Sequence, residues 1–199
     1  MQHPDIAEIL IRLKHADLQL REQLIRKGAL SDGYNDEMKQ LHDANAAKLD
    51  SIIDSIGYPT PDKVGKEGGD AAWLIIQHAI GQPAFMKKCL KLLEKAVGEN
   101  KADPIHLAYL SDRIAVFEEK PQLYGTQFDW DAEGELSPNP TDDPDKVNRR
   151  RKALGLNSLE EQTAILRTRA QEENQSPPAD HAKRQEAVRV WKKQVGWIR

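Results

Sequence analysis

Apolar residues recur at helical spacing along the first part of this chain. Residues 5–27 and 36–56 each carry an apolar residue every three or four positions, which is typical of a helix with one buried face. Gly28 and Gly57 follow these stretches and are suited to end them. Residues 31–36 are rich in turn-forming types. The pattern therefore predicts two amphipathic helices joined by a turn.

More helices are predicted farther along the chain. Residues 70–80 are apolar on nearly every face, which indicates a buried helix with Asp70 as its N-cap and Gly81 at its end. Pro83, Asp103-Pro104, Asp143-Pro144 and the capping box at Ser158 mark further helix starts. They predict helices at 83–97, 105–117, 144–153, 159–173 and 180–195.

Two segments break the helical period. Residues 60–70 are rich in glycine but lack the spacing of a phosphate-binding loop, so the pattern predicts a flexible connector. Residues 121–138 hold strand-forming aromatic residues around Glu133-Gly134, which favours a short hairpin or an extended flap.

These elements predict a mainly α protein. We expect a compact multi-helix bundle with one short β-hairpin and a C-terminal helical extension. The helical domain would cover residues 1–161, with the hairpin at about 121–138, and the extension would cover residues 162–199. Trp191 and Trp197 could dock that extension on the rest of the chain.

Composition narrows the class of protein. No apolar run is long enough to span a bilayer, and no basic leader precedes an apolar stretch at the start. The single cysteine, Cys89, excludes an internal disulfide framework and a thiolate zinc cluster, and it reads best as a small buried apolar residue. A cytoplasmic protein without a membrane partner is therefore expected.

Charge is distributed unevenly. The net charge is −3, but residues 1–145 carry 16 Lys and Arg against 26 Asp and Glu, whereas residues 146–199 carry 13 against 6. A basic tail could bind nucleic acid. We favour packing of the basic tail on the acidic body, because the basic cluster at 149–152 lacks interleaved aromatic residues for stacking on bases.

Several polar residues fall at positions where the helical pattern expects core residues. His42 and Asn45 lie one turn apart in an apolar stripe, and Asp112 and Arg113 interrupt an apolar segment. Burying such groups costs several kcal/mol unless they are paired. The full set is His42, Asn45, Gln77, His78, Asp112 and Arg113, followed by Gln122, Tyr124, Thr126 and Gln127. These residues are expected to meet one another or to line a cavity.

The cavity interpretation predicts an enzyme or a small-ligand-binding protein. His78 would act as general acid or base, Asp112 would orient it or act as the partner acid, and Tyr124 would add a hydroxyl group. A polar or anionic ligand would be bound by His42, Asn45, Gln77, Arg113, Gln122, Gly125, Thr126 and Gln127. No nucleotide-cofactor motif is present, so hydrolysis or elimination is the simplest reaction class.

Two alternatives stay open. The polar residues could be a structural network in a non-enzymatic cytoplasmic protein, such as a protein-interaction or immunity-like factor. A metal could also be held by His42 and His78, with Asp112 as a third ligand. The sequence lacks H-E-x-x-H and H-x-H spacings, so no metal ligand is assigned.

Three blocks, at 57–79, 108–128 and 149–161, occur in an order that resembles a widespread bacterial family of unknown function. The resemblance covers roughly residues 40–161 and rests on Gln-His-Ala, Tyr-Leu-Ser-Asp-Arg and Tyr-Gly-Thr-Gln strings. Tyr58 and Ser111 replace the Trp and Thr that this family often has. The resemblance implies importance for Gln77, His78, Asp112, Arg113, Gln122, Tyr124, Gly125, Thr126 and Gln127, and it implies no particular activity.

Overall fold

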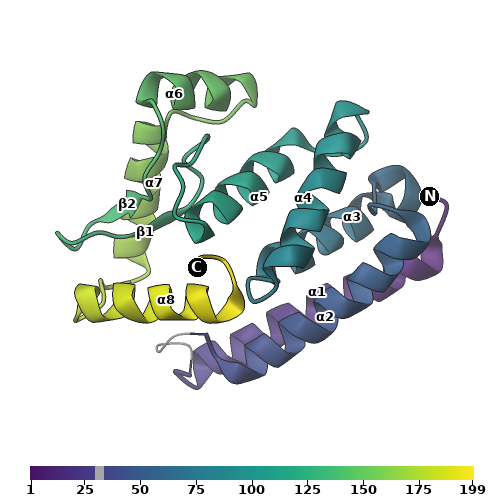
Figure 1. The fold of residues 1–199 in the computed structure, drawn as a ribbon, viewed down its shortest axis with the longest axis horizontal. Helices are drawn as coiled ribbons and strands as arrows, with labels where there is room; N and C mark the ends of the chain where they lie inside the picture. The colour runs from purple at the N-terminus through teal and green to yellow at the C-terminus, as the bar shows by residue number, and fades with distance from the viewer. Residues whose placement is uncertain (30–33) are drawn as a thin grey trace. The chain divides into compact units, whose positions relative to one another are not determined.

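The fold is described by a computed structural model that covers residues 1–29 and 34–199 (Figure 1). The described residues form eight α-helices and one two-stranded antiparallel hairpin. The predicted mainly α class, with one short hairpin and a C-terminal helix, is therefore confirmed. Residues 31–33 of the predicted turn lie outside the described residues. None of the described helices combines the length and the apolar character needed to cross a membrane.

The chain divides into two compact units, Met1–His106 (unit 1) and Leu107–Arg199 (unit 2). The boundary falls in the first turn of α5 (Pro104–Phe117). The boundary that the sequence predicted at residue 161 lies inside α7 (Leu159–Glu172) of unit 2 and stays a prediction.

Unit 1 is built from four helices and the start of the fifth. In Figure 1, α1 and α2 run side by side, and α1 also packs on α3, which contacts α4. The apolar stripes of the sequence face inward, because Leu10, Leu24 and Leu49 are all buried. The four helices are α1 (Pro4–Arg26), α2 (Asp36–Ile56), α3 (Pro61–His78) and α4 (Pro83–Gly98).

The prediction of a flexible connector at 60–70 is wrong, because this segment is the first half of α3. Pro61 starts the helix, where a missing N–H removes no helical hydrogen bond. Gly65 kinks it with φ 73° and ψ 165°. Gly68 is buried, and a Cβ there would lie 3.2 Å from the Cβ of Ala7 in α1. Gly68 therefore allows α3 and α1 to pack closely, and Gly65 allows the kink, so neither glycine makes the segment a flexible connector.

The prediction that Asp70 is the N-cap of a helix is also wrong, because α3 begins well before residue 70. Asp70 lies inside α3 and forms an ion pair with Lys66 one turn earlier, with 2.7 Å between Nζ and Oδ2. The helix ends at His78, because Ala79 has already left helical geometry with φ −73° and ψ 37°. The end of α3 therefore presents His78 in the last turn of a helix.

Unit 2 contains the rest of α5, the hairpin and three more helices. The hairpin pairs β1 (Phe128–Trp130) with β2 (Leu136–Pro138) inside the segment predicted to form it. Asp143 accepts from the backbone N–H of Lys146, and Ser158 forms a complete capping box with Glu161, so both predicted helix starts are confirmed. The helices are α6 (Pro144–Ala153), α7 (Leu159–Glu172) and α8 (His181–Val195).

The C-terminal tryptophans pack on α5 of the same chain, within unit 2. The ring of Phe117 lies 5.7 Å from that of Trp191 and 4.9 Å from that of Trp197, measured between ring centroids. Trp197 is buried. Large aromatic rings bury much apolar surface, so these contacts hold the end of α8 within unit 2.

Candidate functional site

The centre of the candidate site is Asp17, a carboxylate in the middle of α1. Its position continues the apolar stripe of α1, seven residues after Leu10 and seven before Leu24. The residue is fully buried, with 0% of its surface exposed. A buried carboxylate needs compensating partners, and Asp17 finds them on two other helices of unit 1.

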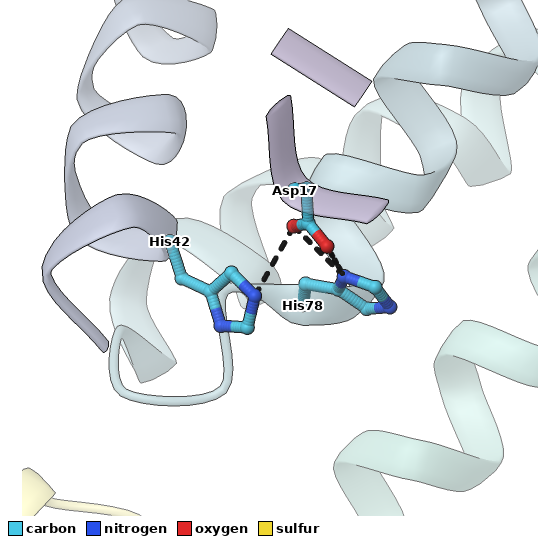
Figure 2. Close-up of side chains that lie close together, drawn as sticks. All are labelled: Asp17, His42 and His78. Carbon is cyan, nitrogen blue, oxygen red and sulfur yellow. Dashed lines mark hydrogen bonds and ion pairs between the residues drawn. The ribbon is translucent and has the colours of Figure 1, made fainter. Parts of the chain in front are cut away.

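His78, the last residue of α3, is the first of these partners. Its Nδ1 lies 2.9 Å from both carboxylate oxygens of Asp17 (Figure 2). The His78 side chain keeps 27% of its surface exposed. One edge of the imidazole is therefore fixed by a buried acid, while the ring still reaches solvent.

His42 of α2 is the second partner. Its Nε2 lies 3.1 Å from Oδ2 of Asp17, and its ring centroid lies 5.1 Å from that of His78. On the other edge of the ring, Nδ1 lies 2.6 Å from the hydroxyl oxygen of Tyr34. Figure 2 shows the two imidazoles on either side of the Asp17 carboxylate. Three helices thus bring one acid and two imidazoles together.

The electrostatics of the cluster favour an ionised acid. Burial alone would raise the pKa of Asp17, but the adjacent imidazoles of His42 and His78 outweigh it and hold the pKa at about 2. Burial, with a further contribution from Asp43 and Asp17, raises the pKa of the Tyr34 phenol. At neutral pH the cluster therefore contains a carboxylate and a protonated phenol.

Neighbouring polar groups lie around this cluster. Asn45, which is buried, donates to the backbone carbonyl of Leu13 at 3.4 Å. Asp43, next to His42, accepts from Gln82 at 3.0 Å and from Lys39 at 2.6 Å. Burial alone would raise the pKa of Asp43, but the hydrogen bonds from Gln82 and Lys39 outweigh burial and lower that pKa. Gln77, beside His78 in α3, is also buried.

The cluster has the chemistry for proton transfer and for metal ligation. Among the described residues, one ligand atom each from Asp17, His42 and His78 lies within 4.8 Å of the others. An imidazole oriented by a carboxylate is a common general base. Two imidazoles and a carboxylate also form a ligand set used by zinc and non-haem iron sites.

The remaining predicted site residues lie in unit 2, where Asp112 is the central polar group. Asp112 is fully buried, with 0% of its surface exposed. Its Oδ1 accepts from the backbone N–H of Leu123 at 2.8 Å, its Oδ2 accepts from that of Thr126 at 3.0 Å, and both oxygens lie 3.2 Å from the N–H of Tyr124. Burial raises the pKa of Asp112, while these N–H groups act in the opposite direction.

The side chain of Gln122 holds together the loop formed by residues 122–127. Its side chain is fully buried, accepts from the backbone N–H of Gln127 at 2.7 Å and donates to the carbonyl of Asn139 at 2.8 Å. Gly125 has φ +61°, and a Cβ there would lie 2.6 Å from Cδ1 of Leu159. The loop 122–127 is therefore closely packed and internally hydrogen-bonded.

The basic cluster at 149–152 also contributes to this loop. Arg151 is buried and donates to the carbonyl oxygens of Tyr124 and Asn157 at 2.8 and 2.7 Å. Arg150 pairs with Asp142 at 2.9 Å. Two of the four residues of this basic cluster, Arg150 and Arg151, therefore bind groups within unit 2.

The other predicted residues of unit 2 have varied surroundings. Thr126 accepts at its hydroxyl from the side-chain amide of Gln127 at 3.0 Å. Arg113 is partly buried, and burial lowers its pKa to about 10, so its guanidinium stays charged at neutral pH. His78 and Asp112 lie in different units, and their pairing stays a prediction.

Sequence reasoning missed Asp17 and Tyr34. Asp17 left a detectable signal, because an acid occupies a position where the stripe of α1 requires an apolar residue. Tyr34 left none, because it lies in a segment of turn-forming residues without the periodic pattern that marks a buried position.

The comparisons with known proteins identify the family and nothing beyond it. The model of a family of unknown function (DUF6624) matches residues 4–171, so the chain belongs to that family. The matched stretch includes Asp17, Tyr34, His42 and His78. Searches of the curated proteins and of the solved structures found no match.

Proposed function

We propose that this member of a family of unknown function is an enzyme or small-ligand-binding protein whose working site is the Asp17–His42–His78 cluster. The chemistry would be proton transfer on a polar or anionic substrate, with hydrolysis or elimination as the simplest reaction class. The observation that carries the proposal is a partly exposed imidazole, His78, held at 2.9 Å by both oxygens of a fully buried carboxylate.

The geometry gives each atom of the pair a role. Asp17 is ionised at neutral pH, so it accepts a hydrogen bond and selects the tautomer of His78 with the proton on Nδ1. The lone pair then lies on Nε2, the nitrogen remote from Asp17, which can take a proton from a substrate or a water. Asp17 and the negative end of α3 both lie against this imidazole, because His78 is the last residue of that helix.

The energetics support a functional origin for the cluster. A buried ionic group is often no more stabilising than apolar residues of similar size. Unit 1 nevertheless places a carboxylate and two imidazoles in the contact region of three helices. Chemistry at these groups accounts for their presence better than stability does.

The alternative is a non-enzymatic interaction protein in which the polar residues are structural. The contacts in unit 2 favour a structural role for Asp112 and Gln122, because both satisfy backbone groups of the loop. Unit 1 differs, since the groups that face Asp17 there are titratable side chains.

A thermal-shift screen tests the proposal. Chelator-treated wild type, His78→Gln and His15→Gln would be screened with nucleotides, sugar phosphates, amino acids and peptides, since a ligand that prefers the native state raises Tm. His15→Gln is a matched control, because His15 lies exposed on α1 only two residues from Asp17.

We expect a ligand that stabilises wild type and His15→Gln but has no effect on a folded His78→Gln. A ligand that stabilises all three variants equally would place the site elsewhere. A screen without hits, together with a strongly destabilised His78→Gln, would support the structural alternative.

A further inference from the structure

We infer that Asp17, His42 and His78 bind one divalent first-row transition metal ion, for which zinc is the simplest occupant. This inference rests on the proposed function, because it names the group that would supply proton-transfer chemistry at the same site. It also assigns a use to His42, which the proton-transfer proposal leaves without one.

The ligand set fits such an ion in number and type. Two imidazole nitrogens and one carboxylate oxygen come from three different helices, and all lie within 4.8 Å of one another. Catalytic zinc sites use three protein ligands and leave a position open for water or substrate. The His78 side chain is 27% exposed, so one of the three ligands reaches solvent.

The strongest observation is the state of Nε2 of His42. His42 is only 7% exposed, and its Nε2 is buried without a hydrogen-bond partner among the described residues. The atom lies 3.1 Å from Oδ2 of Asp17, but the direction of that contact is outside hydrogen-bond geometry. A buried nitrogen directed into a cluster that already contains a carboxylate and another imidazole is well placed to donate its lone pair to a cation.

Tyr34 supports the same assignment. When Nε2 of His42 is a metal ligand, the ring proton must be on Nδ1, and Nδ1 lies 2.6 Å from the Tyr34 hydroxyl oxygen. Metal-binding histidines nearly always hydrogen-bond through the second ring nitrogen, which fixes the tautomer and the orientation of the ring.

Charge also favours a cation. Asp17 carries a negative charge in a buried position, and the groups that lower its pKa are the two imidazoles of His42 and His78. A divalent ion would neutralise the carboxylate and bind both neutral imidazoles. This agrees with the general rule that buried charges are paired or coordinate metals.

Ion binding would alter the proton positions in a defined way. In the metal-free chain, Nδ1 of His78 donates its proton to Asp17. An ion bound at Nδ1 replaces that hydrogen bond, and the imidazole proton moves to Nε2, so the imidazole stays neutral. Nε2 can then no longer accept a proton, and a water on the ion, after losing a proton to solvent, would act as the base instead.

X-ray absorption spectroscopy on the wild-type chain is the first test. The protein would be treated with a chelator and reloaded with one equivalent of Zn²⁺. We expect a first shell of nitrogen and oxygen at about 2.0–2.1 Å, with outer-shell scattering from two imidazoles. A shell of water oxygens alone, or one that contains sulfur, would overturn the inference even if every variant failed to fold.

Zinc affinity in competition with a chromophoric chelator is the second test. His15→Gln should bind like wild type. Tyr34→Phe should bind about 10- to 100-fold more weakly, as is usual when a group that hydrogen-bonds a ligand is lost. His42→Gln and His78→Gln should lose more than Tyr34→Phe does. Equal affinity in all four variants would contradict the assignment.

Parallel titrations with Mn²⁺, Co²⁺ and anaerobic Fe²⁺ identify the ion. Binding of any of them through both imidazoles supports the inference. If none of the four ions binds, the inference is overturned.

The failure of this inference can be told apart from the failure of the proposed function. A small-molecule response that depends on His78 without metal binding leaves the proposed function intact, whereas a bound metal without any small-molecule response makes the site structural.

Discussion

Asp17 and Asp112 are two fully buried carboxylates that differ in what surrounds them. Each interrupts the apolar pattern of a helix, Asp17 in α1 of unit 1 and Asp112 in α5 of unit 2. Asp17 faces two imidazoles, whereas Asp112 faces three backbone N–H groups. The pKa of Asp17 falls to about 2, while that of Asp112 is raised.

The difference shows how partner type separates chemical from architectural roles. Backbone N–H groups do not titrate, so a carboxylate that binds them orders the chain and can do little else. Imidazoles exchange protons and bind metals near neutral pH. The same residue type at the same burial therefore fixes a loop in unit 2 and forms a candidate reactive centre in unit 1.

The largest predicted effect is the loss of stability in Asp112→Asn. The new amide would direct N–H groups at backbone N–H groups of Tyr124 and Thr126, and a buried donor left unsatisfied costs about 1–3 kcal/mol. We expect the free energy of unfolding in urea to fall by about 3 kcal/mol. Glu133→Gln, which makes the same chemical change at an exposed position, should change it little. Equal effects of the two variants would show that Asp112 does not organise the loop.

Gly125→Ala should produce the next largest loss. The left-handed backbone costs a residue with a Cβ about 1–2 kcal/mol, and the new Cβ would contact Leu159 at 2.6 Å. Gly155→Ala separates the two causes, because Gly155 has φ +70° but nothing within 4 Å of a Cβ. In urea unfolding, Gly125→Ala should be clearly less stable than Gly155→Ala, and the reverse order would refute close packing of the loop.

Asp17→Asn should have a small effect on stability and a large one on the site. The new carbonyl can accept from Nδ1 of His78, so the hydrogen bond to that ring survives, and the side chain keeps its size. We expect a loss of about 1 kcal/mol in urea, together with loss of any small-molecule response found in the thermal-shift screen. A response that persists in Asp17→Asn would remove Asp17 from the working site.

The smallest effect is predicted for Cys89, a buried titratable group in α4. Burial, with a contribution from Asp50, raises the pKa of the thiol to about 12, so it stays protonated at neutral pH. Iodoacetamide should modify native protein negligibly and urea-unfolded protein at the rate of an ordinary thiol. Fast modification of the native chain would show that burial alone does not suppress reactivity.

The sequence was informative about helices because their signals are local. Periodic apolar residues and residues such as Pro104, Asp143 and Ser158 determine a helix within a few positions, and the structure confirms these elements. The role of Gly68 was not predictable in this way, because it depends on Ala7 of α1, a residue some 60 positions away in the chain. A glycine for close packing and a glycine for flexibility look alike in a single sequence.

The candidate site was less accessible to sequence reasoning. The positions of His42 and His78 marked them as polar groups on buried faces, but which acid they meet depends on how three helices cross. Asp17 lies 61 residues before His78 and shares no local pattern with it. In unit 2, the predicted group of Asp112, Gln122 and residues 124–127 does lie together, because the loop closes directly back on α5.

The most direct test of this account is the affinity for Zn²⁺ of chelator-treated wild type, Asp17→Asn and Asp112→Asn, measured by isothermal titration on the folded fraction of each. We expect one tightly bound ion in wild type and in Asp112→Asn, and no tight binding in Asp17→Asn. Absence of tight binding in wild type, or an equal loss of affinity in both variants, would contradict the assignment of a zinc site to Asp17 and its two imidazoles.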